Sequence, residues 1–412
     1  MRLRHVDGQT VHLGYCTNVH PAEDLAGVLA QLDAYALPIR RRLGTDVLGL
    51  GLWLAAPVAA GLAAEPAARR RLRAELDARG LEVVTLNGFP YRAFQSPVVK
   101  HAVYRPDWTS RDRLDYTVNL ARVLVDLLPV DAARGSISTL PLAWRDPWDA
   151  GRAEATTRML DRLAGALTEL AWSTGRAVRV AFEPEPGCVV ERTGQAVRLL
   201  SGVDTDRLGV CLDLAHLACA WEEPAAALAT LESAGLPVVK VQVSAALEAA
   251  DPVAAADRLR EYVEPRFLHQ TRCAAGAGAA DPADPAYAAD DLDEALARNL
   301  PGPWRVHYHV PLHAVPEPPV RSTVPVLRAA LAELLAGPVA ACDHYDVETY
   351  TWGVLPAARR PRTAGQLADG IAAELAFARA ELLALGLADG SAPGPAPAAA
   401  PGLSADHDKE VR

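Results

Sequence analysis

Four short apolar runs, each ending in an acidic or imidazole side chain, constrain the fold of this chain most strongly. They are VRVAFEPEP (178–186), LGVCLDLAH (208–216), VHYHVPLH (306–313) and CDHYDVETYTW (342–352). Apolar runs of this length are typical of buried parallel strands. Because α/β barrels carry their chemistry at the carboxyl ends of such strands, the polar residues that end these runs are candidates for one shared site.

Strand patterns alternate with helical patterns along most of the chain. Leu25, Val28, Leu29 and Leu32 recur at helical spacing between two strand candidates, and this arrangement repeats further on. Such alternation predicts parallel βα units, eight of which close into a (β/α)8 TIM barrel. The strand candidates are 12–18, 47–54, 82–89, 135–142, 178–185, 208–216, 238–244, 305–312 and 346–352. These are one too many for the barrel, so we expect either 238–244 or 305–312 to lie outside it.

The remaining segments predict how the chain is divided. Residues 1–388 are expected to form one barrel domain that ends in a helix at roughly 363–387. An insertion at about 265–303 includes a stretch, 272–296, rich in Gly, Ala, Asp and Pro, which predicts a mobile lid near the barrel mouth. The Pro/Ala-rich tail at 389–412 is expected to be disordered.

Composition excludes several classes of protein. A net charge of −10 argues against a nucleic-acid-binding protein, which would carry a basic face. The N-terminus lacks a signal-peptide core, and the most apolar stretch, 48–64, is interrupted by Gly and Pro, so we expect a cytoplasmic protein without a membrane span. The six cysteines lack CxxC spacing and are expected to be free thiols.

Two of the runs carry carboxylates in positions suited to chemistry. Glu183 ends an apolar strand immediately before a proline, and Glu185 lies two residues further on the same face of extended chain. Asp213 is followed three residues later by His216, and carboxylate with imidazole is a common ligand pair for first-row metals. The alternatives are a surface carboxylate at Glu183 and a helix N-cap at Asp213.

The later runs add further candidates. Glu348 lies among aromatic residues, where a carboxylate is costly unless a metal or a hydrogen-bond donor meets it. His307 and His309 alternate on one strand face, an arrangement suited to a metal or a polar substrate. Gln242 and Lys240 share one face of 238–244, and Gln242 is either a ligand or a hydrogen-bonded core residue.

Amides and one histidine end two other strand candidates. Asn18 and His20 follow the first strand, and Asn87 ends the third. These residues can bind substrate hydroxyls or connect loops. No phosphate-binding P-loop, dinucleotide-binding glycine fingerprint or nucleophile elbow is found, which argues against nucleotide-cofactor and serine-hydrolase functions.

Several phrases together resemble the EboE family of metabolite traffic proteins, within the xylose isomerase-like TIM-barrel superfamily of sugar phosphate isomerases, epimerases and endonuclease IV-type enzymes. The phrases are CTNVHP (16–21), LNGFPYR (86–92), FEPEPG (182–187), CLDLAH (211–216), KVQVSAAL (240–247), FLHQ (267–270), HYHVP (307–311) and VETYTW (347–352). The resemblance implies one divalent metal ion, Mn, Zn, Fe or Mg. It also implies partners among other Ebo proteins, including a membrane prenyltransferase-like protein, in metabolite export.

The resemblance also implies roles for individual residues. Glu183, Asp213 and Glu348 correspond to the superfamily's metal ligands, and His216 contacts metal or substrate. The superfamily places His on the seventh strand, where this chain offers Gln242 or, further on, His309 or His307. We therefore expect a metal site of Glu183, Asp213, Gln242, His309 and Glu348, with substrate-binding roles for His216, His307, Lys240, Asn18, His20 and Asn87.

The expected function is metal-dependent isomerisation or epimerisation of a small-molecule metabolite. Glu183 and Glu348 would move a proton to and from the carbon beside a polarised carbonyl or hydroxyl pair. Two alternatives stay open: a noncatalytic metabolite carrier in an export system, and a metal-dependent hydrolase of the endonuclease IV type. The acidic balance of the chain argues against a DNA substrate for the latter.

Overall fold

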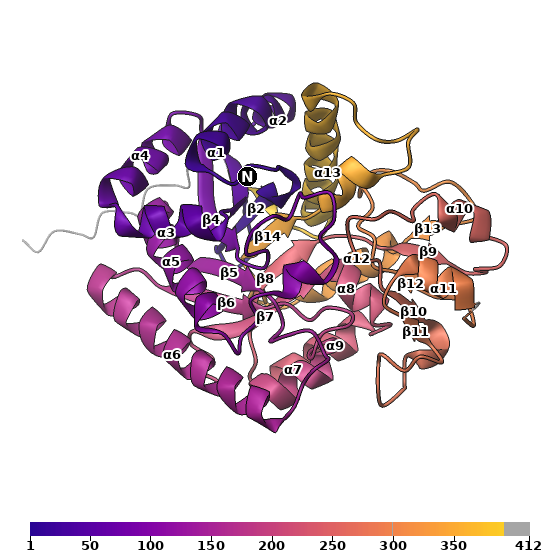
Figure 1. Cartoon of the computed structure of the whole chain (residues 1–412). Coiled ribbons are helices and arrows are strands. Elements are labelled where there is room, and N and C mark those ends of the chain that lie inside the picture. Colours follow the sequence, from indigo (N-terminus) through magenta and orange to yellow (C-terminus); the bar gives the residue numbers. More distant parts are fainter. Residues whose placement is uncertain (299, 391–412) are drawn as a thin grey trace, which may run out of the picture.

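The computed structural model describes residues 1–298 and 300–390. Its central feature is a closed barrel of parallel strands surrounded by helices (Figure 1). β14 pairs in parallel with both β8 and β2, and this double pairing closes the barrel. The predicted (β/α)8 barrel is confirmed. Its strands are β2 (Thr10–Cys16), β3 (Leu48–Trp53), β4 (Leu81–Asn87), β5 (Gly135–Thr139), β6 (Val178–Phe182), β7 (Leu208–Asp213), β8 (Val238–Val243) and β14 (His344–Val347).

The helices form the outer layer because each carries an apolar stripe that packs against the strands. In α5, for example, Leu120, Val123, Leu124 and Leu127 are buried. The outer helices are α1 (Leu25–Gln31), α2 (Leu37–Leu43), α3 (Ala56–Ala64), α4 (Pro66–Asp77), α5 (Arg111–Leu127), α6 (Ala150–Thr174), α7 (Thr193–Leu200), α8 (Leu214–Cys219), α9 (Pro224–Ser233), α12 (Val324–Leu335) and α13 (Ala364–Ala384). The helix predicted at 363–387 is therefore present as α13.

Two of the predicted strands differ from the structure. Of the two competing runs, 238–244 supplies the barrel strand β8, whereas 305–312 contributes only β12 (Trp304–Val306) to another sheet. Both runs have the same alternating pattern, so the distinction depends on tertiary pairing. The run 346–352 is also shorter than predicted: β14 ends at Val347 and the chain turns into a 3₁₀ helix at Tyr350–Val354.

A second, antiparallel sheet lies beside the barrel, to its right in Figure 1. Its order is β11 (Ala288–Ala289), β10 (Thr271–Cys273), β12, β9 (Leu247–Ala249) and β13 (Arg321–Ser322), with α10 (Ala256–Arg260) and α11 (Leu292–Arg298) alongside. The insertion predicted at 265–303 thus contains two strands and a helix, and buries Leu292 and Ala295. Its predicted mobility stays a prediction.

The two ends of the described chain meet at the barrel. β1 (Arg2–Arg4) pairs antiparallel with β2 and with β15 (Ala388–Asp389). Asp389, which was predicted to begin the disordered tail, therefore belongs to a strand. Residues 391–412, for which disorder is predicted, lie outside the described residues. The six cysteines are buried free thiols, as predicted. Among the described helices, none has the length and apolar character needed to cross a bilayer.

Candidate active site

Parallel strands bring their carboxyl ends to one edge, here called the mouth of the barrel. Polar, buried side chains occupy this edge at the ends of six strands. They are Asn18 after β2, Asn87 in β4, Glu183 after β6, Asp213 in β7, Gln242 in β8 and Glu348 after β14. The structure thus brings together residues that are far apart in the sequence, as expected for a barrel active site.

Asp213 has two roles, one for each carboxylate oxygen. Its Oδ1 caps α8 by accepting from the backbone N–H of His216 at 2.8 Å, and it also accepts from Ser244 Oγ at 2.8 Å. Its Oδ2 is buried, has no hydrogen-bond partner, and lies 3.9 Å from His309 Nε2. The N-cap and ligand interpretations of Asp213 are therefore compatible.

Glu183 and Gln242 form a buried pair. Gln242 Nε2 donates to Glu183 Oε1 at 2.5 Å, which leaves Gln242 Oε1 and Glu183 Oε2 without partners. Because a carboxylate accepts hydrogen bonds, the amide oxygen of Gln242 is the free atom. A carbonyl oxygen and a carboxylate oxygen are both suitable ligands for a hard divalent cation.

His309 presents a nitrogen lone pair to Asp213. Its Nδ1 is 2.6 Å from the backbone carbonyl of Glu348, which can only accept, so Nδ1 carries the hydrogen. Its Nε2 is buried and has no hydrogen-bond partner. Burial lowers the pKa of His309 and so favours the neutral ring. This is the tautomer in which histidine binds metal ions, with the second nitrogen held by a carbonyl.

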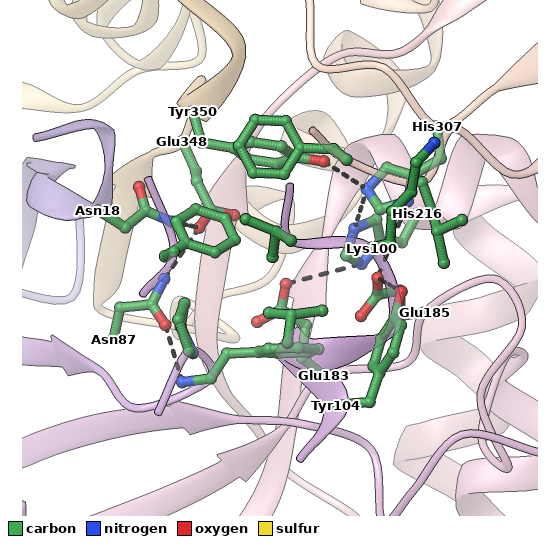
Figure 2. A pocket seen from close by; sticks show the side chains of 17 residues that line it. Asn18, Asn87, Lys100, Tyr104, Glu183, Glu185, His216, His307, Glu348 and Tyr350 are labelled. Atoms are coloured by element: carbon green, nitrogen blue, oxygen red, sulfur yellow. Dashed lines mark hydrogen bonds and ion pairs between the residues drawn. The ribbon is translucent and has the colours of Figure 1, made fainter. Parts of the chain in front are cut away.

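Glu348 is held by two amides. Asn18 Nδ2 and Asn87 Nδ2 donate to its Oε1 at 2.7 and 2.9 Å, and Figure 2 shows both amides directed at it from one side of the pocket. Besides the substrate-binding role predicted for them, Asn18 and Asn87 therefore orient the side chain of Glu348.

His216 and His307 face each other on the other side of the pocket (Figure 2). Their Nε2 atoms are 2.9 Å apart, while their Nδ1 atoms meet the carbonyl of Pro184 at 3.0 Å and Gln270 Oε1 at 2.7 Å. If both Nδ1 atoms carry hydrogen, two lone pairs face each other. A shared proton or a cation between the rings would relieve this repulsion.

The structure places two predicted substrate-binding residues away from the pocket. Lys240 points into the barrel one layer below Gln242, about 6.6 Å deeper at the usual strand rise. Its Nζ is 3.1 Å from Asp346 Oδ2, and both side chains are fully buried. A Cβ on Gly51 would lie only 1.6 Å from that oxygen, so glycine makes room for the pair. His20 stacks on Tyr35, with ring centroids 4.0 Å apart, and does not line the pocket.

Other residues of the pocket gave no clear signal in the sequence. Tyr104 donates to Glu185 Oε1 at 2.8 Å and accepts from Gln270 Nε2 at 2.9 Å, and Glu185 Oε2 is buried without a partner. Glu185 could be noticed because it follows Glu183 by two residues. Tyr104 ends a 3₁₀ helix (Lys100–Tyr104) and Gln270 directly precedes β10, and only the tertiary fold brings them to the mouth. The space between the lining residues amounts to about 490 Å³ when the solvent at the opening of the pocket is included.

Electrostatics in the pocket favour a cation. Burial, Glu348 and Asp213 raise the pKa of Glu183 well above its usual value, and burial and Asp213 raise the pKa of Glu348 to about 8. Burial also raises the pKa of Glu185 and lowers the pKa of His216 to about 4. Several carboxylates close together cannot all ionise unless positive charge is supplied. We call Glu183, Asp213, Gln242, His309 and Glu348 the carboxylate cluster.

The cluster has the donors that a metal ion needs. Three groups of side chains each offer ligand atoms within 4.8 Å of one another: Glu183, Asp213 and His216; Asp213, His309 and Glu348; and His216, His307 and His309. Asp213, His216 and His309 each belong to two groups. Carboxylate, amide and imidazole donors suit a divalent first-row metal or magnesium.

A family model described as xylose isomerase-like TIM barrel matches residues 41–265. The chain belongs to the xylose isomerase-like TIM barrel family. A comparison with curated proteins found no match.

The chain is also similar, at low identity, to several solved structures. One is a candidate sugar phosphate isomerase/epimerase from Anabaena variabilis, with 15% identity and a TM-score of 0.51 over 92% of this chain and 100% of that chain. A xylose isomerase-like TIM barrel protein from Mycobacterium smegmatis, in complex with magnesium, has 14% identity and a TM-score of 0.49 over 90% and 98%. An L-ribulose 3-epimerase has 12% identity and a TM-score of 0.46 over 91% and 95%.

Proposed function

We propose that this protein is a divalent-metal-dependent isomerase or epimerase of small polyhydroxylated carbonyl compounds. The observation that carries the proposal is a set of buried polar atoms without partners: Glu183 Oε2, Asp213 Oδ2, Gln242 Oε1 and His309 Nε2. Leaving such atoms unsatisfied costs roughly 1–3 kcal/mol each, so a ligand that meets them all is strongly favoured. A divalent cation is the ligand that this donor set suits.

The residues that would hold the ion are those of the carboxylate cluster. Manganese, zinc, iron and magnesium all accept oxygen and imidazole donors of this kind. When bound, the ion would polarise a substrate carbonyl or a pair of hydroxyls, which makes the neighbouring carbon-bound hydrogen more acidic.

The chain's own side chains would transfer the proton. Glu183 and Glu348 approach the pocket from β6 and β14 and both line it. One carboxylate would take the hydrogen from the carbon beside the carbonyl, and the other would return a proton to the same or the adjacent carbon. The amides of Asn18 and Asn87 fix the direction of Glu348 through its Oε1. His216 and His307 offer hydrogen bonds to substrate hydroxyls.

The wider role that we propose is that of an EboE-type protein. The phrases shared with that family support a place in cytoplasmic metabolite processing that precedes export. Other Ebo proteins, including the membrane prenyltransferase-like one, would then be partners. Isolation of the protein with its neighbours from cells would test this role separately from the chemistry.

Metal content and hydrogen exchange test the chemistry. We expect the purified protein to hold about one divalent ion per chain, and to exchange a carbon-bound hydrogen of at least one ketose or aldose with D₂O. Glu348→Gln should slow exchange by roughly 10²–10⁴, the usual contribution of general acid–base catalysis, after correction for metal content. Glu154→Gln on the exposed face of α6 is the control. A metal-loaded protein that retains a ligand but never exchanges its hydrogen would instead be a carrier.

A further inference from the structure

The pocket above the carboxylate cluster has an apolar wall. Phe94, Phe267 and Tyr350 line the pocket and pack on one another, with ring centroids 5.2, 5.3 and 4.8 Å apart. We call these three side chains the aromatic wall. Phe94 lies in the loop after β4, Phe267 lies in the loop before β10, and Tyr350 begins the 3₁₀ helix after β14, so packing within one element does not explain their meeting.

The aromatic wall is in contact with the site. The ring centroid of Tyr350 lies 4.7 Å from that of His309, and its hydroxyl is 3.3 Å from His307 Nε2. Figure 2 shows Tyr350 reaching from above Glu348 toward His307. A molecule held at the cluster therefore has the flat apolar surface of the wall beside it.

The charge of the pocket is unsuitable for a phosphate group. Glu183, Glu185 and Glu348 line it, and among the described lining residues Lys100 is the only side chain with a fixed positive charge. Lys100 is already ion-paired with Asp291 of the 265–303 insertion. Proteins commonly hold phosphate with unpaired arginine or lysine side chains, and no such side chain is found among the lining residues that the structure describes.

Glu185 offers a further polar contact beside the site. Its Oε1 accepts from Tyr104, and its Oε2 is buried and unpartnered. A hydroxyl group is a suitable partner for this unpartnered carboxyl oxygen. It can donate to the oxygen when the carboxyl group is ionised and accept from it when the carboxyl group is protonated.

We infer that the substrate is an uncharged polyol or hydroxycarbonyl compound that carries a flat apolar group such as an aryl ring. The reacting end lies at the carboxylate cluster, a hydroxyl contacts Glu185 Oε2, and the apolar group lies against Phe94, Phe267 and Tyr350. This inference rests on the proposed function and names its substrate class. It excludes a phosphorylated sugar as the preferred ligand.

Three probes that share one reacting end test the inference by calorimetric titration of the Mn²⁺-loaded protein: D-fructose, its 6-phosphate and its 6-O-benzyl ether. We expect the benzyl ether to bind at least about tenfold more tightly than fructose, and the phosphate more weakly than fructose. Phe94→Ala and the bulkier Phe267→Leu, which guards against misfolding, should each remove most of this advantage of the benzyl ether over fructose. Trp172→Ala, at an exposed position on α6, is the control.

The outcomes separate this inference from the proposed function. Tightest binding of the phosphate, equal binding of fructose and its benzyl ether, or no binding of any probe overturns the inference. An advantage for the benzyl ether that persists in both phenylalanine variants also overturns it. If the benzyl ether binds as expected but no carbon-bound hydrogen exchanges with solvent, the inference stands and the proposed catalysis fails.

Discussion

At the scale of single residues, Asp213 shows how one side chain serves both the fold and the site. Its Oδ1 caps α8, while its Oδ2 faces the cluster. Asn is about as good an N-cap as Asp but carries no charge. The variant Asp213→Asn therefore separates the two roles.

We expect metal-free Asp213→Asn to melt at a temperature no lower than that of the natural chain, because the cap is kept and a charge that opposes ionisation of Glu183 and Glu348 is removed, and we expect it to lose metal affinity. The loss should be at least about 10- to 100-fold, since even partners of metal ligands contribute that much. Asp213→Ala should also lose about 1 kcal/mol of stability through the missing cap. Calorimetric metal titration and thermal unfolding measure the two effects. Unchanged metal affinity in Asp213→Asn would remove Asp213 from the site.

The buried carboxylate of Glu348 serves the proposed function but lowers the stability of the metal-free chain at high pH. Burial and Asp213 raise its pKa to about 8 from the usual 4.5. A group with a raised pKa stabilises the fold while it is protonated, and this stability is lost as the pH rises from about 4.5 to about 8. Gln is neutral at every pH and avoids that loss.

Metal-free Glu348→Gln should therefore be more stable than the natural chain at pH 8, by ~1–3 kcal/mol, and equally stable near pH 4. Denaturant unfolding across this pH range, with metal chelated, measures the difference. Saturating metal should reverse the order, because the ion stabilises only the chain that retains the carboxylate. A pH-independent difference would show that the pKa of Glu348 is the same in the folded and the unfolded chain.

At the scale of elements, α13 holds together the two loops that carry His309 and Glu348. The buried carboxylate of Glu374 accepts at Oε1 from the backbone N–H of Leu312 at 3.0 Å and from Thr349 Oγ1 at 2.6 Å. Its Oε2 accepts from Trp352 Nε1 at 3.1 Å. One side chain thus fixes both loops relative to the barrel.

We expect Glu374→Ala to lower the free energy of unfolding by ~3 kcal/mol or more, because three buried donors lose their acceptor. It should also weaken metal binding through the loosened loops. The free energy of unfolding of Glu374→Gln should lie between those of Glu374→Ala and the natural chain, since Gln keeps one acceptor oxygen. Glu381→Gln, on the same helix and paired with Arg328 at the surface, should change stability by less than ~1 kcal/mol. If Glu374→Ala were as stable as the natural chain, Glu374 would not hold the two loops together.

The elements also show what the sequence could and could not predict. Strands and their terminal residues follow local patterns, so Glu183, Asp213, Gln242 and Glu348 could be found. The runs 238–244 and 305–312 have equal patterns, and only pairing with β7 and β14 selects the first as a barrel strand. An alternating strand pattern does not show how deep in the barrel a side chain lies. For this reason Lys240 was predicted to lie at the pocket, although it lies one layer below Gln242.

At the scale of the whole molecule, the barrel supplies the polar cluster and the loops supply the rest of the pocket. His20 was expected beside Asn18, but a 3₁₀ turn at Thr17–Val19 directs it to Tyr35 instead. Gln270, Tyr104 and the aromatic wall come from segments that meet only in the folded chain. No local period marks such residues, so they could not be predicted from the sequence.

The central claim is a divalent cation in the carboxylate cluster at the mouth of the barrel. Anomalous diffraction from a crystal grown with Mn²⁺ tests it most directly. We predict one strong anomalous peak bonded to Glu183, Asp213 and at least one of Gln242, His309 and Glu348, at about 2.0–2.3 Å. A fully occupied Mn²⁺ elsewhere, with no peak among these side chains, would contradict it.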